Sequence, residues 1–212
     1  MPRPARIVLL VAAAALPALA LAAPVSTPVP VSATFDRVAS RGDFDVEVKE
    51  GSPASVEIVA EPGWAGRIDV EVSGNQLRLS RKRDFDSARG VLVRVVVPTV
   101  RALSVSGSGK LAWKGTAAAL DVAVSGSGDA RLAGKADRLK AAVAGSGDID
   151  AKDCPVRDAT VSIAGSGDVA VRLSGGTLTA QIAGSGDVNW WGEGTVGAVA
   201  TAGSGRVRQR RD

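Results

Sequence analysis

The chain has 212 residues, of which one is cysteine and none is histidine or tyrosine. A single cysteine excludes an intrachain disulfide, and the absence of histidine removes both the commonest general base and the commonest transition-metal ligand. The net charge of +4 is small and is not arranged as a basic stripe interleaved with aromatic residues, so the composition argues against nucleic-acid binding.

The first 22 residues predict a cleaved signal peptide. Arg3 and Arg6 precede an apolar run of about 16 residues that ends in Ala20-Leu21-Ala22, the small-x-small pattern of a signal peptidase site. The alternative is a membrane anchor, but the run is shorter than the ~20 residues that a spanning helix needs. No cysteine follows the run, so we do not expect a lipoprotein anchor. The expected location is the periplasm or the cell exterior, with no membrane span after cleavage.

Residues 23–32 are rich in proline, and we expect a disordered leader there. Residues 33–100 then alternate apolar and polar side chains in short runs, which is typical of strands with one buried face. These runs have no strict period. We expect irregular opening coils that also cap the regular part of the fold, because the first coil of a solenoid must be covered. The runs are 44–48, 56–58, 68–72, 77–79 and 91–97.

Residues 101–208 contain a six-fold repeat marked by the tripeptide Gly-Ser-Gly. The apolar positions lie four and two residues before the first glycine and four and six residues after it, which is strand alternation on both sides of a turn. Helical repeats are disfavoured because glycine weakens helices. Antiparallel hairpins would not require a constant period, whereas parallel coils stacked about 4.8 Å apart do. The tripeptides begin at Gly107, Gly126, Gly145, Gly165, Gly184 and Gly203, at spacings of 19 or 20 residues.

The predicted fold is therefore an all-β parallel β-solenoid with coils of about 19 residues. Residues 33–208 form its single domain, and residues 209–212 are a basic tail. Trp113 and Trp190 share an inward position and are expected in the core. Cys154 lies in the one 20-residue unit, in a turn bulge within 150–158, and no histidine is available to activate its thiol.

One outward position, just after the turn, carries four aspartates between two cations. Stacked carboxylates about 5 Å apart repel one another, so something must offset the repulsion. The favoured explanation is hydrogen bonding to turn N–H groups, with the glycines supplying positive φ. The other is Ca²⁺ bridging between coils, since Ca²⁺ prefers oxygen ligands. The aspartates, between Lys110 and Arg206, are Asp129, Asp148, Asp168 and Asp187.

A second outward position, seven residues after the first glycine, is mostly basic and includes Trp191. Cations beside an exposed tryptophan suit an anionic glycan or a lipopolysaccharide surface. The alternative is that the cations only discourage aggregation between sheets. The candidates for surface binding are Trp191, Lys152 and Arg172.

These motifs together resemble a bacterial family, the putative auto-transporter adhesins with a head GIN domain. The resemblance rests on Phe35-Asp36-x-Val38, Gly42-x-Phe44-Asp-Val46, Gly74-Asn-Gln-Leu77-x-Leu79, Val97-Pro98 and the repeated Gly-Ser-Gly-Asp. It implies a right-handed parallel β-helix in a secreted or cell-envelope protein, and it brings no catalytic residues.

The function expected from the residues is non-catalytic: an adhesin-like module that binds an envelope glycan or a surface protein, without a cofactor. The rival is a polysaccharide lyase or hydrolase that uses Asp148, Asp168, Lys152 and Arg172. An active site should break the repeat locally, and these positions do not. A third possibility is a structural or assembly protein of the envelope.

Overall fold

The computed structural model describes residues 23–31 and 33–211, so the predicted signal peptide lies outside the described residues. Fourteen strands join in one sheet system, and the only helical element in this part of the chain is a 3₁₀ turn, η1, at Ala65–Arg67. The strands are β1 (Val25–Val29), β2 (Arg37–Gly42), β3 (Asp45–Glu50), β4 (Ser55–Ala60), β5 (Ile68–Ser73), β6 (Gln76–Arg81), β7 (Leu92–Val97), β8 (Ala102–Gly107), β9 (Lys110–Gly126), β10 (Asp129–Gly145), β11 (Ile149–Gly165), β12 (Val169–Gly184), β13 (Val188–Gly203) and β14 (Val207–Gln209).

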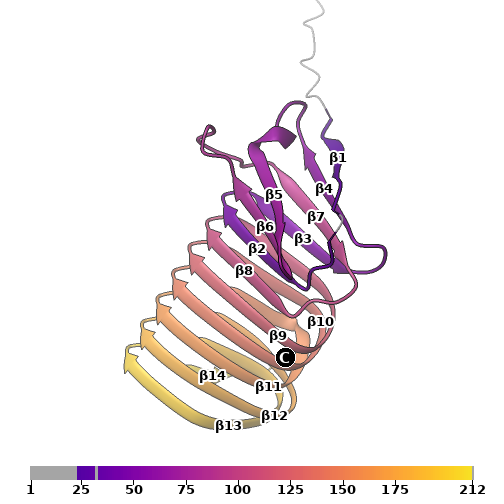
Figure 1. Ribbon diagram of the computed structural model, residues 1–212. Coiled ribbons are helices and arrows are strands. Elements are labelled where there is room, and N and C mark those ends of the chain that lie inside the picture. The colour runs from indigo at the N-terminus through magenta and orange to yellow at the C-terminus, as the bar shows by residue number, and fades with distance from the viewer. Residues whose placement is uncertain (1–22, 32, 212) are drawn as a thin grey trace, which may run out of the picture.

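Each Gly-Ser-Gly unit forms one coil of a parallel solenoid, as predicted (Figure 1). Val124 pairs with Val143, Val143 with Ile163 and Ile163 with Ile182, so equivalent positions of successive units lie side by side. The pairing is parallel throughout β9 to β13, which excludes the hairpin alternative. Followed from the indigo end to the yellow end in Figure 1, the coils wind in the right-handed sense that the family resemblance implies.

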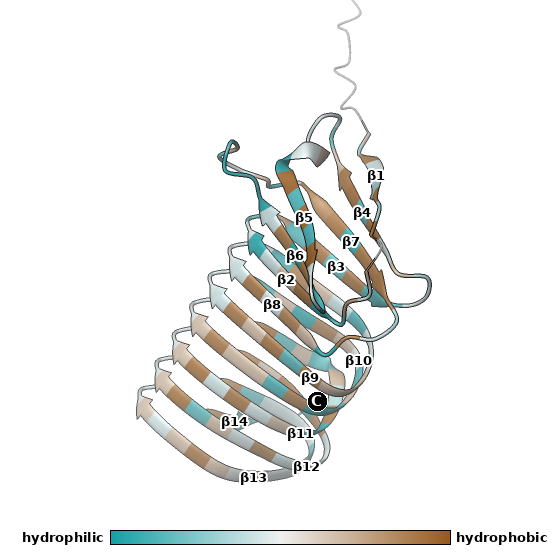
Figure 2. Ribbon diagram, in the orientation of Figure 1, coloured by the Kyte–Doolittle hydropathy of each residue, from teal (hydrophilic) through white to brown (hydrophobic). Residues whose placement is uncertain are grey.

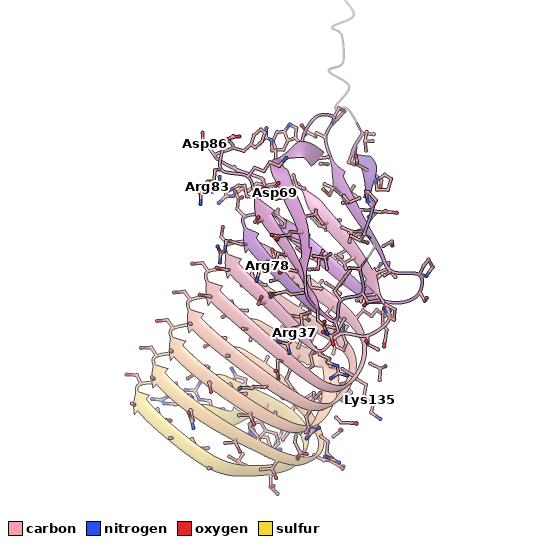
Figure 3. All side chains as sticks on the ribbon, viewed as in Figure 1. Arg37, Asp69, Arg78, Arg83, Asp86 and Lys135 are labelled. Atoms are coloured by element: carbon pink, nitrogen blue, oxygen red, sulfur yellow. The ribbon has the colours of Figure 1, made fainter. Side chains whose placement is uncertain are left out.

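The coils are flattened into two walls joined by turns. The front wall consists of β5, β6, β2, β8 and the second halves of β9 to β13; the back wall consists of β1, β4, β7, β3, the first halves of β9 to β13, and β14 (Figure 1). The Gly-Ser-Gly turns join the walls along one edge, and a smooth bend, near Lys135 in Figure 3, joins them along the other. The four predicted inward columns are buried between the walls in every coil before the last, and Trp113 and Trp190 are both core residues.

Close stacking of the coils requires both glycines of each turn, since a Cβ on Gly165 would overlap the carbonyl oxygen of Gly145, and the first glycine is needed for its backbone conformation as well. The first, such as Gly165, has a positive φ of 139°, which confirms the expected use of glycine in the left-handed region. The second, such as Gly167, has an ordinary φ, but a Cβ there would overlap the backbone carbonyl oxygen of Gly147 in the preceding coil. Close stacking of the turns therefore explains the second glycine. The longer unit carries its extra residue as register shifts in β11 between Ala151 and Ala159, where the bulge was expected.

The region before the repeat forms coils whose order in space differs from their order in the chain. β2 and β3 make one coil, and it lies between the coil of β6 and β7 and the coil of β8 and β9. Val38 thus pairs with Leu77 on one side and Leu103 on the other. Antiparallel strands then cover the N-terminal end: β5 on the front wall, and β4 followed by β1 on the back wall.

The prediction of a disordered leader at residues 23–32 is wrong for residues 25–29, which form a strand. β1 pairs with β4 in antiparallel register from Val25 opposite Ala60 to Val29 opposite Val56. Pro28 is tolerated because β1 is an edge strand, where a missing N–H on the outer side breaks no ladder. At the other end, Gln209 and Arg210 of the basic tail are held on the last coil, because the backbone N–H of Arg210 donates to the carbonyl of Trp190 at 2.8 Å.

Candidate functional site

The aspartates that follow the Gly-Ser-Gly turns form a ladder of hydrogen bonds along the solenoid. The backbone N–H of Asp168 donates to Oδ1 of Asp148 at 2.7 Å, and that of Asp187 donates to Oδ1 of Asp168 at the same distance. Asp129 accepts from Asp148 at 3.4 Å, and Asp187 accepts from Arg206 at 2.9 Å. Backbone N–H groups are therefore the partners, as the favoured explanation required. The donor, however, belongs to the next coil rather than to the aspartate's own turn.

A fifth aspartate, Asp45, makes the same kind of bond two coils before Asp129, and Lys110 stands in the coil between them. The backbone N–H of Lys110 donates to Oδ1 of Asp45 at 3.1 Å, which is the same bond nearer the N-terminal end of the solenoid. Gly42 is in register with Gly107, and Phe44 takes the place of the second glycine. The signal was Gly42-Asp-Phe-Asp45, which has the spacing of Gly-Ser-Gly-Asp.

The aspartates of the ladder make structural contacts, since each of them accepts a hydrogen bond from a backbone N–H of the next coil. The four predicted calcium candidates stand one per coil in a line, and within the described residues no group of three or more Asp, Glu, Cys or His side chains is arranged to hold a metal ion. Asp187 also forms an ion pair with Arg208, at 3.1 Å from Nη1 to Oδ2.

A groove of about 610 Å³ runs beside the upper part of the ladder on the back wall, and its lining includes five acidic and two basic side chains. Asp45, Lys110 and Asp129 lie on one side of this groove, and the ion pair between Arg131 and Asp150, 3.2 Å long, on the other. Asp148 lines the groove, whereas the other three residues of the enzyme hypothesis do not. The structure therefore does not gather the four proposed catalytic residues in this groove.

The three surface-binding candidates lie together on the back wall. Nζ of Lys152 is 5.6 Å from the centroid of the Trp191 ring, two coils away, within range of a cation–π interaction. Arg172 occupies the intervening strand, in register with Trp191, and its Nε donates to the carbonyl of Lys152 at 3.0 Å. We call Lys152, Arg172 and Trp191 the Trp191 patch.

Trp191 was expected to be exposed, and its side chain is half-buried. Glycines at 192 and 194 leave it little cover from its own strand, but the long side chain of Lys152 reaches over the ring. Lys152 is itself anchored by Asp150, whose Oδ2 is 3.8 Å from Nζ. These contacts fix the side chains of the patch relative to one another.

Two further titratable groups have structural roles. Burial raises the pKa of the Cys154 thiol to about 11, so this cysteine is unreactive, as expected. Partial burial acts to raise the pKa of Asp43, but hydrogen bonds from the Ser87 hydroxyl (2.6 Å) and the Ala88 N–H (3.0 Å), together with the Arg81 guanidinium, bring it below its ordinary value. These contacts fasten the loop between β6 and β7 to the turn after β2.

Comparison with known proteins agrees with this geometry. Residues 34–194 match the profile of the family described as "Putative auto-transporter adhesin, head GIN domain". The chain belongs to this family. The matched range contains the motifs on which the resemblance rested and all three residues of the Trp191 patch, so the patch lies within the head GIN domain itself.

Solved structures share the fold of this head GIN domain at low sequence identity. A putative adhesin from Bacteroides fragilis NCTC 9343 has a TM-score of 0.70 and 19% identity, with 88% of this chain and 97% of that chain covered. A putative lipid binding protein from Parabacteroides distasonis ATCC 8503 has a TM-score of 0.52 and 20% identity, over 89% and 97%. A putative adhesin from the same organism has a TM-score of 0.50 and 19% identity, over 89% and 98%. No protein of curated function matches the chain.

Within the described residues, no helix is long and apolar enough to cross a membrane.

Proposed function

We propose that this head GIN domain is an exported, non-catalytic binding module that holds an anionic glycan of the cell envelope on the Trp191 patch. The contact between Lys152 and Trp191 carries the proposal. It places a cation and an aromatic face side by side on a flat wall, with a guanidinium on the strand between them.

The chemistry of such a patch suits a charged sugar chain. The face of a tryptophan ring packs against the apolar face of a sugar, while lysine and arginine pair with carboxylate or phosphate groups. Strands of successive coils stand about 4.8 Å apart, so the three side chains form a row across the strands along which an extended chain can lie. Lys152 already lies over the Trp191 ring, so a sugar stacks on the part of the ring that remains exposed, and little side-chain entropy is lost on binding.

The description of the family as putative adhesins, and the putative adhesins among the similar structures, support a non-catalytic function. The regularity of the walls supports it as well: the aspartates of the enzyme hypothesis, Asp148 and Asp168, are engaged in the same backbone contacts as their neighbours in other coils.

Binding should be measured by calorimetry with a polyuronate, purified lipopolysaccharide and an uncharged polysaccharide. We expect affinity for the polyuronate or lipopolysaccharide, falling with added salt, and none for the uncharged chain. Trp191→Ala and the double variant Lys152→Ala with Arg172→Ala should each weaken binding about tenfold or more. Lys114→Ala, from the same column in another coil, is the matched control and should have little effect. Binding that survives loss of Trp191, or no binding to either anionic glycan, would refute the proposal.

A further inference from the structure

The last coil of the solenoid is covered on only one side. β14 pairs with β13 at residues 188–190 alone, so among the described residues the front-wall stretch 195–203 has a neighbour in β12 and none beyond. Val196 and Val199 are 42% and 45% exposed, although the residues they stack upon, Leu178 and Ala180, are fully buried. At this stretch the apolar core is open to solvent, and the outer backbone N–H and C=O groups of the strand have no neighbouring strand to pair with.

The two ends of the solenoid differ in how they protect their edges. At the N-terminal end, β1 carries Pro28, and β5 carries Asp69, which pairs with Lys82 at 3.7 Å; Figure 3 shows Asp69 on this end of the molecule. Proline and charge are the usual means of blocking edge-to-edge pairing. Residues 194–205 contain neither, and Figure 2 colours the front of β13 pale to brown. The C-terminal edge is thus unprotected.

The end face also has the shape of a step. β14 extends the back wall by one strand beyond β13, while the front wall stops at β13 (Figure 1). A twofold axis parallel to the strands, running between the walls, exchanges the front wall of one molecule with the back wall of another. β14 of each copy then fills the missing layer of the other, and both walls and the core become continuous.

The strand directions and the inward columns agree with this arrangement. The two walls run in opposite directions, so β14 meets the partner strand in antiparallel orientation, with the turn edges on the same side. Inward positions then face inward positions: Thr201 lies opposite the second copy's Val207, and Val199 opposite its Gln209. The arginines of the tail meet no like charge, since residues 194–205 are uncharged and Arg208 is already paired with Asp187.

We propose that this end face is a dimerisation surface whose partner is a second copy of the same chain, joined by reciprocal pairing of β14 with the free stretch of β13. The interface is isologous and closes after two copies. It is independent of the Trp191 patch, and it leaves the charged N-terminal ends at the two far ends of the dimer.

The mass of the purified full chain, measured by light scattering and by sedimentation over a wide range of concentration, tests the proposal. We expect a dimer, and we expect Val199→Lys to weaken it about a hundredfold because the ammonium group would be placed in the joined core. Val25→Lys is the matched control, since Val25 is 51% exposed on the edge strand at the opposite end; it should leave the dimer intact. Lys152→Ala should also leave it intact, which separates this proposal from the binding function.

A cysteine pair tests the predicted register without relying on a charged substitution. In the double variant Val199→Cys with Gln209→Cys the two new thiols lie on opposite walls of one molecule but opposite each other across the interface. Oxidation should give a covalent dimer on non-reducing gels, and neither single variant should. A monomeric wild-type protein, open-ended polymers, equal disruption by Val25→Lys, or no covalent dimer from the double variant would each overturn the proposal.

Discussion

The backbone N–H of Asp187 donates a 2.7 Å hydrogen bond to Oδ1 of Asp168, the residue one coil before it. The same bond joins Asp45 to Lys110 and then runs unbroken from Asp129 to Arg206, so each of these carboxylates ties its own coil to the next. Between the two parts, at Lys110, the N–H of Asp129 donates to the carbonyl of Gly109 instead. These charge-assisted hydrogen bonds offset the repulsion between the stacked carboxylates.

Removing one carboxylate from the ladder should lower stability modestly. We expect Asp168→Ala to reduce the free energy of unfolding by about 1 kcal/mol, since the bond is charge-assisted but exposed. Asp168→Asn should lose less, because its amide oxygen can still accept. Chemical denaturation measures both. If Ca²⁺ raises the melting temperature of the wild type, and Asp148→Asn with Asp168→Asn abolishes the rise, the ladder is a metal site and our structural interpretation is wrong.

The second glycine of a turn should be far less replaceable than the serine before it. Gly167→Ala places a Cβ against the carbonyl oxygen of Gly147, and backbone cannot move aside without separating the coils. We expect a loss of more than about 1 kcal/mol in the free energy of unfolding, and Ser166→Ala, on the exposed side of the same turn, should change it little. Equal effects of the two substitutions, compared by thermal unfolding, would show that the turns are not closely stacked.

Trp113 should dominate the stability of the upper coils. Its side chain is buried, and truncation in Trp113→Ala should cost about 3–5 kcal/mol, whereas Trp191→Ala on the outer surface should cost much less. Trp113→Phe should be milder than Trp113→Ala, because Nε1 of Trp113 is buried without a hydrogen-bond partner in the described structure and its loss leaves no acceptor unpaired. Denaturant titrations of the three variants give the order.

Stability should depend on acid through Asp43. Its pKa is lower in the folded protein than in the unfolded chain, so its contribution is fully present above the unfolded value of about 3.9 and is lost as the pH falls through the folded value. We expect Asp43→Asn to be less stable than the wild type by about 1 kcal/mol at pH 7, and the difference to disappear in strong acid. A difference for Asp43→Asn that is constant with pH would contradict the assignment.

The regular half of the fold could be read from the sequence because its period sets its contacts. Positions 19 or 20 residues apart become neighbours, so a buried column such as Val124, Val143 and Ile163 is visible as a column of letters. The N-terminal half offered no such guide. Val38 pairs with residues about 40 and 65 positions away, and no local pattern states which coil lies between which.

The sequence predicted which residues make up the site, but it did not predict how deeply their side chains are buried. Lys152, Arg172 and Trp191 share a column in the sequence and a surface in the structure. The partial burial of Trp191 was missed because its cover comes from a side chain two coils away. Asp45 was missed because Phe44 interrupts the Gly-Ser-Gly pattern. β1 was missed because a proline-rich composition does not show that β4 is available as a pairing partner for an edge strand.

β2 and β3 lie between two coils that come later in the chain, and this position affects the order in which strands can pair during synthesis. Both parallel neighbours of β2, at residues 76–81 and 102–107, leave the ribosome after it does. The first coil to be synthesised therefore waits for two later segments of the chain before it can complete its hydrogen bonding. The Gly-Ser-Gly coils, in contrast, can each close on the coil immediately before them as soon as they are made.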